Sequence, residues 1–135
     1  MNRRQNRVGY SLKIDKERRL VTVSVWGVLD KESVLAFRRE LLADEDFKPE
    51  FNQLIEYNPD TKLALSSQEV DELKFSDPFS PVSRRAAVAH SDVLFGYARM
   101  YASLMEARGQ EKIRAFRTRA EAVLWIEAEQ AAGSQ

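Results

Sequence analysis

The chain has 135 residues, which is the length of one globular domain. It contains no cysteine, which excludes disulfide scaffolds, zinc–thiolate sites and thiol nucleophiles. Its 21 Lys and Arg residues balance its 21 Asp and Glu residues, so it lacks the overall positive charge expected of a nucleic-acid-binding protein. One histidine and five glycines are little material for a metal cluster or a phosphate-binding loop, and we expect neither a metal nor a cofactor.

The N-terminal segment is basic, but no apolar run follows it. Three arginines within residues 1–7 precede a strand-like pattern rather than the apolar core of a secretion signal. No stretch approaches the roughly 20 apolar residues of a membrane-spanning helix. We therefore expect a cytoplasmic protein in which residues 1–9 form a disordered basic arm, residues 10–130 form one domain and residues 131–135 form a tail.

Two segments near the N-terminus alternate apolar and polar residues. Tyr10–Ile14 and Leu20–Trp26 have the period of two that is typical of half-buried strands. The polar turn at residues 15–19 joins them, so we predict an antiparallel hairpin. Gly27 is expected to end the second strand.

Helix and strand signals alternate in the middle of the chain. Asp30 is expected to cap a helix that Pro49 prevents from continuing. Asn52–Tyr57 is predicted to form a short third strand. Ser66 and Glu69 have the spacing of a capping box, which predicts the start of a second helix.

The alternation continues in the second half. Arg85–Ala89 is a small apolar run that predicts a strand buried on both faces. A long helix over residues 92–108, a strand over Lys112–Phe116 and a last helix from Thr118 to about Gln130 follow. This order predicts a single α/β domain with a mixed five-stranded sheet and four helices, in which the first strand is an antiparallel edge and the other strands are mostly parallel.

Short motifs in this order resemble a known family. Gly27-Val-Leu-Asp30 resembles the Gly-x-Leu-Asp that opens the first helix of STAS domains (sulphate transporter and anti-sigma factor antagonist). The second half resembles more closely the SpoIIAA-like, STAS/SEC14-type family of small bacterial proteins, through Arg85–Ala89, Phe95–Tyr101, Phe116-Arg117 and Glu121–Ile126. The resemblance implies a mixed sheet with packed helices and no established common chemistry. It implies two kinds of role, because STAS domains act as protein-interaction switches and SEC14-type relatives bind lipid.

The resemblance also implies a place for phosphorylation. In anti-sigma factor antagonists, a serine in an Asp-Ser-Ser-Gly-like stretch at a helix start is phosphorylated. Leu65-Ser-Ser-Gln68 occupies that place, with Ser66 and Ser67 as candidate phosphoacceptors or anion-site residues, but it lacks the acidic residue and the glycine. A helix N-terminus favours a phosphate, whereas a capping box gives Ser66 a structural role, and both interpretations stay open.

The only histidine, His90, follows the fourth predicted strand at the carboxyl edge of the sheet, where open α/β folds bind ligands. Other polar residues are expected at the same edge, namely Asp60, Ser66, Asp92 and Arg117. The sequence contains no nucleophile-elbow, dinucleotide-binding or Walker motif, so we do not expect an enzyme.

The helix predicted over residues 92–108 is apolar around much of its circumference, which is more than one sheet contact requires. Either it is buried inside its own domain or it forms the contact of a homodimer. The candidate interface residues are Tyr97, Met100, Tyr101 and Leu104.

The loop over residues 75–85 places Phe79 among prolines, where it is expected either to pack on the core or to cover an apolar pocket. The candidate pocket residues are Phe79, His90, Tyr97 and Tyr101. We predict a non-catalytic regulatory or protein-interaction module with an unidentified protein partner. The alternative is a protein that binds an apolar small molecule or a lipid in this pocket.

Overall fold

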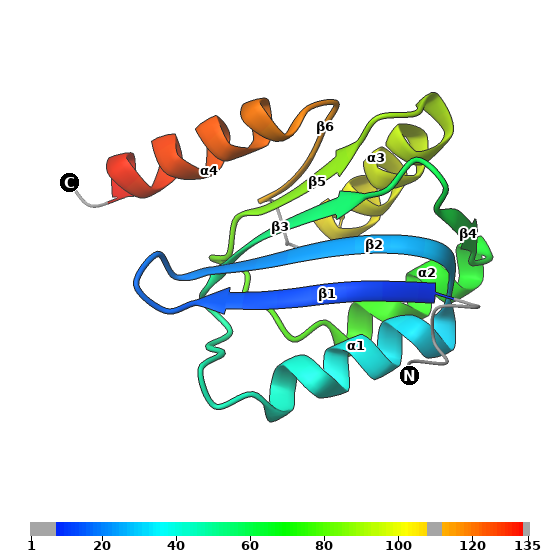
Figure 1. Cartoon of the computed structure of the whole chain (residues 1–135), viewed down its shortest axis with the longest axis horizontal. Coiled ribbons are helices and arrows are strands. Elements are labelled where there is room, and N and C mark those ends of the chain that lie inside the picture. The colour runs from blue at the N-terminus through cyan, green and yellow to red at the C-terminus, as the bar shows by residue number, and fades with distance from the viewer. Residues whose placement is uncertain (1–7, 108–111, 134–135) are drawn as a thin grey trace.

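Helices pack on both sides of a mixed β-sheet in the computed structural model, which describes residues 8–107 and 112–133 (Figure 1). The described elements, in chain order, are β1 (Val8–Asp15), β2 (Leu20–Asp30), α1 (Lys31–Ala43), β3 (Asn52–Tyr57), β4 (Lys62–Ala64), α2 (Ser67–Leu73), the 3-10 turn η2 (Lys74–Ser76), β5 (Arg85–Ala89), α3 (Asp92–Glu106), β6 (Ile113–Phe116) and α4 (Arg119–Gly133).

The main sheet has the strand order β1-β2-β3-β5-β6. β1 is antiparallel to β2 at one edge, and the other neighbours in this order are parallel. The predicted mixed α/β domain with an antiparallel first strand is therefore confirmed. Successive right-handed crossovers that move one way along a sheet leave their helices on one face. We call the face covered by α1, α2 and α3 the inner face, and the face covered by α4 the outer face (Figure 1).

The sheet has six strands rather than the predicted five, because Gly27 does not end the second strand. Gly27 has a φ of 84°, a conformation that glycine adopts without the steric cost of a Cβ atom. Pairing with β1 ends at this residue, and the last part of β2, Val28–Asp30, pairs instead with Lys62–Ala64 of β4. A three-residue strand is too short to show a period in the sequence.

Two apolar clusters hold the helices to the sheet. The buried residues of the inner cluster are Val21, Val23, Val25, Leu41, Phe47, Phe51 and Phe79. Those of the outer cluster are Leu54, Ala86, Val88, Ala122 and Ile126. The division follows the strand period of two, which turns Leu54, Ala86 and Val88 toward α4 and their neighbours toward the inner helices.

The helix caps agree with the sequence pattern, and the element ends differ by a few residues. Asp30 accepts a 2.8 Å hydrogen bond from the Ser33 backbone N–H, and the capping box of Ser66 and Glu69 is present. α4 runs to Gly133, beyond its predicted end. Residues 1–7 and 134–135, with most of the predicted arm and the end of the predicted tail, lie outside the described residues. Among the helices that are described, none is long and apolar enough to cross a membrane.

Candidate ligand pocket

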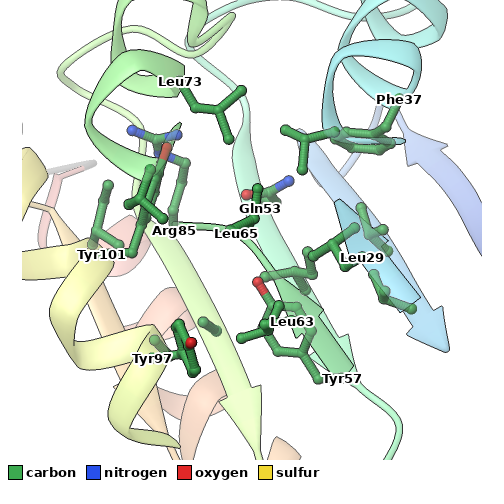
Figure 2. A pocket seen from close by; sticks show the side chains of 18 of the residues that line it. Leu29, Phe37, Gln53, Tyr57, Leu63, Leu65, Leu73, Arg85, Tyr97 and Tyr101 are labelled. Atoms are coloured by element: carbon green, nitrogen blue, oxygen red, sulfur yellow. The ribbon is translucent and has the colours of Figure 1, made fainter. Parts of the chain in front are cut away.

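A cavity of about 150 Å³ lies between the inner face of the sheet and the helices α1, α2 and α3 (Figure 2). Alternate residues of the three central strands form its floor, namely Val23, Val25, Gln53, Ile55, Tyr57, Arg85 and Ala87. The helices and loops supply the remaining walls, among them Phe37, Arg38, Leu63, Phe79, Tyr97 and Tyr101. The wall is mostly apolar with few polar groups, which is the usual composition of a small-molecule site.

The register of the strands explains why space remains in the middle of this floor. Val23 of β2 lies opposite Ile55 of β3, which lies opposite Ala87 of β5. An alanine at the third position of this row leaves unfilled the volume that a larger strand residue would take. Tyr97 and Ala98 of α3 also line the cavity, so a second small side chain contributes to the space.

Some polar side chains that line the cavity lack a hydrogen-bond partner in the part of the chain that the structure describes. The Gln53 amide, the Tyr57 hydroxyl and the Tyr97 hydroxyl make no hydrogen bond to any residue that the structure describes. The Gln53 residue is only 8% exposed. None of the polar atoms of these three groups is fully buried, so water in the cavity reaches them, and the polar atoms of a ligand would take the place of that water.

Burial also changes the acidity of one of these groups. Loss of contact with water raises the pKa of the Tyr57 phenol to about 12, and the neighbouring Tyr101 adds to the rise while Arg38 opposes it. Tyr57 therefore stays protonated over the whole physiological range and presents a neutral hydroxyl to the cavity.

A buried polar network lies at the end of the cavity near Arg85 and Tyr101, and Tyr57 and Tyr97 lie toward the other end (Figure 2). The Nη1 atom of Arg85 lies 2.5 Å from Oδ2 of Asp77, and both side chains are almost fully buried. The Tyr101 hydroxyl joins this pair, 3.4 Å from the same Asp77 oxygen. The network fixes the loop before β5 against the sheet, because Asp77 also accepts a 2.9 Å bond from the Phe79 backbone N–H.

The second arginine of this network, Arg38, comes from α1 and is 9% exposed. Its Nη1 atom donates to the Leu73 carbonyl at the end of α2 and, over 2.9 Å, to the Ser76 hydroxyl. Its Nη2 atom lies 3.1 Å from the Tyr101 hydroxyl. Burial raises the pKa of Tyr101, and the adjacent Arg38 cation opposes that rise. All of these partners of Arg38 are neutral.

The structure brings together three of the four predicted pocket residues. Phe79, Tyr97 and Tyr101 line the cavity, whereas His90 is not among its described lining residues. His90 follows β5 in the position that points toward the outer side, where its Nε2 atom lies 2.9 Å from Glu56 Oε2. Partial burial raises the pKa of the Glu56 carboxyl, but hydrogen bonds from His90 and Arg119 outweigh this effect and lower it overall. His90 therefore lies apart from the other three predicted pocket residues.

The edge residues predicted beside His90 do not form one group. Arg117 and Asp92 pair over 2.6 Å, and no bond between His90 and either of them is seen among the described residues. Ser66 is exposed and caps α2, and neither Ser66 nor Ser67 lines the cavity. Phosphorylation of either serine stays a prediction.

The apolar side chains of α3 lie largely inside their own domain. Tyr97, Met100 and Tyr101 line the cavity, and Leu104 is half-buried. Much of the apolar surface of α3 is therefore covered within its own domain and does not require contact with a second copy of the chain. The homodimer stays a prediction, which light scattering of the purified protein tests.

Sequence reasoning missed the polar residues of the pocket. Gln53 and Arg85 occupy inner-face positions of their strands, opposite each other in the register. Arg38 lies one helical turn from Val34 and Leu41, in the stripe that faces the sheet. Each of them occupies a position where the strand or helix periodicity predicts an apolar residue. That mismatch is the sequence signal that indicates a functional polar residue.

Comparisons with known proteins support the fold. No protein-family model and no curated protein matches the chain. The structure is similar to that of an uncharacterized protein of the DUF3478 family with a SpoIIAA-like fold from Shewanella loihica PV-4, with a TM-score of 0.55 and 16% sequence identity over 93% of this chain and 98% of that chain. At this identity the likeness shows the fold and carries no function. The chain therefore has the SpoIIAA-like α/β fold that its motifs resemble.

Proposed function

We propose that this protein is a non-catalytic binding protein for a small, mainly apolar molecule, which occupies the cavity on the inner face of the sheet. The observation that supports this proposal most strongly is a set of three polar groups, on Gln53, Tyr57 and Tyr97. They line an apolar cavity and have no hydrogen-bond partner within residues 8–107 and 112–133. The polar atoms of a ligand would bond the groups that they reach, and its body would fill the apolar volume between them.

The size of the cavity limits the ligand. A cavity of about 150 Å³ holds a molecule of roughly the size of benzene. A two-chain membrane lipid has several times as many atoms. The cavity thus favours a single ring or a short branched chain over the lipid that the SEC14-type resemblance implies.

A regulatory role is compatible with this proposal. A ligand that binds only the folded protein stabilises it, and the gain rises with ligand concentration. Because the inner helices α1, α2 and α3 all contribute to the cavity wall, ligand binding restrains them together. A partner that contacts these helices would then sense the ligand, which is how a small binding domain acts as an interaction module.

Ligand-observed NMR with a library of small aromatic and branched aliphatic compounds tests the proposal. Ala87→Leu places extra methyl groups in the cavity, and Ala128→Leu makes the same change at an exposed position of α4 on the other side of the sheet. We expect the wild type and Ala128→Leu to bind the same subset of compounds, and Ala87→Leu to bind none of them. Equal binding by both variants, or a wild type that binds no compound, contradicts the proposal.

A further inference from the structure

Arg38 is a buried cation in the wall of the pocket. Its side chain lines the cavity, and the residue is 9% exposed. Buried charges in proteins are normally paired with an opposite charge, because removal of an ion from water is unfavourable. No carboxylate among the described residues forms an ion pair with Arg38; the buried carboxylate nearby, Asp77, pairs with Arg85.

The known partners of Arg38 compensate its charge only in part. The Leu73 carbonyl at the C-terminus of α2 contributes the partial negative charge of a helix end, and the Ser76 and Tyr101 hydroxyls contribute dipoles. These bonds leave further N–H donors of the guanidinium unused. The wall of the cavity is thus mostly apolar, and at Arg38 it offers a buried positive charge with unused N–H donors.

We propose that the ligand is a monocarboxylic acid with a small apolar body, and that Arg38 binds its carboxylate at the end of the cavity where Tyr101 and Arg85 lie. This inference rests on the proposed function. One carboxylate neutralises one unpaired cation, and a guanidinium matches the planar geometry of a carboxylate. A dianionic phosphate would bring a second charge that the apolar wall leaves uncompensated.

The end of the cavity opposite Arg38 determines which substituent the acid can carry. Gln53 and Tyr57 lie four residues apart on β3, which corresponds to about 13 Å along a strand. An acid held at Arg38 places its body over Ile55 and Ala87, between these two residues. The neutral hydroxyls of Tyr57 and Tyr97 then face the end of the body, where they accommodate an uncharged polar substituent.

NMR titration of the full-length protein with matched neutral and anionic ligands tests the inference. The pairs are benzoate with benzamide, and 2-methylpropanoate with 2-methylpropanamide as a smaller body. We expect the wild type to bind the acid of a pair at least about tenfold more tightly than the amide, which corresponds to about 1.4 kcal/mol. Phenyl phosphate is expected to bind more weakly than benzoate. An amide that binds as tightly as its acid overturns the inference without any variant.

Substitutions assign the preference to Arg38. Arg38→Gln is expected to abolish the preference for the acid, and Arg38→Lys to retain part of it. Arg39→Gln, which removes the exposed arginine next in the chain, is expected to leave the preference unchanged. A preference that persists in Arg38→Gln overturns the inference. If neutral compounds bind the wild type and acids do not, this inference fails and the proposed function stands; if nothing binds, both fail.

Discussion

Replacement of Gln53 by leucine is expected to stabilise the protein while it weakens ligand binding. The Gln53 side chain lies in the cavity wall without a hydrogen-bond partner among the residues described. Leucine has a similar size, removes the unsatisfied amide and adds apolar surface to the inner cluster. A residue kept for structure alone would show the opposite effect, because most core substitutions destabilise a protein.

The magnitude follows from the cost of an unsatisfied buried polar group, about 1–3 kcal/mol. Water that enters the cavity makes some of the hydrogen bonds of the Gln53 amide, so we expect a value in the lower half of this range. Gln53→Leu should therefore raise the free energy of unfolding by about 1–2 kcal/mol. For a domain of this length, such a gain raises Tm by about 3–8 °C.

Urea unfolding followed by the fluorescence of the two tryptophans measures this change. Gln68→Leu is the matched control, because Gln68 is exposed on α2 and its replacement should alter stability by less than about 0.5 kcal/mol. If Gln53→Leu lowers the free energy of unfolding, the amide is satisfied within the folded chain, and the assignment of Gln53 as a ligand-facing group is wrong.

Three further predictions concern the pocket network and the cap of α2. Asp77→Asn should destabilise the protein by about 3 kcal/mol or more in urea unfolding, because it removes the negative charge that pairs with the buried Arg85 cation. A loss below about 1 kcal/mol contradicts a buried pair. Tyr57 has a pKa of about 12 in the folded protein, whereas the unfolded chain loses this proton near pH 10. The stability that depends on its neutral form is therefore fully present below pH 10 and falls as the pH rises toward 12. Unfolding measured across this range should show a shallower fall in Tyr57→Phe, and identical pH profiles would refute the raised pKa. Ser66→Ala should cost about 1 kcal/mol as a lost cap and Ser66→Asp less, since aspartate also caps a helix; equal losses for both would show that the serine does more than cap.

The sequence predicts the layers of this fold better than it predicts the cavity inside them. The alternation in Tyr10–Ile14 and Leu20–Trp26 specifies the hairpin, and Asp30 and Ser66 mark helix starts, because these signals are local. Gly27 does not end its strand as predicted, since a glycine with positive φ bends a strand as readily as it ends one.

The cavity depends on which side chains from distant elements face one another. Ala87 leaves space only because Ile55 and Val23 share its row, and that register is set by crossovers that no short pattern encodes. The sequence does indicate Phe79 and Tyr101, because large aromatic residues in a proline-containing loop or on a broadly apolar helix are typical of buried contacts. The position of His90 just after a strand does not reveal which side of the sheet it takes, and strand alternation turns it to the outer side.

The most direct test of a ligand site between the sheet and its inner helices is a map of contacts between bound ligand and methyl groups. Protein with carbon-13-labelled methyl groups, saturated with benzoate or with the tightest compound from the fragment library, is examined for nuclear Overhauser effects from ligand to protein. The account predicts strong effects to the methyl groups of Ala87, Ile55 and Val23, which share one row of the cavity floor. Effects confined to exposed methyl groups such as those of Val93 or Leu124, with none to that row, would contradict it.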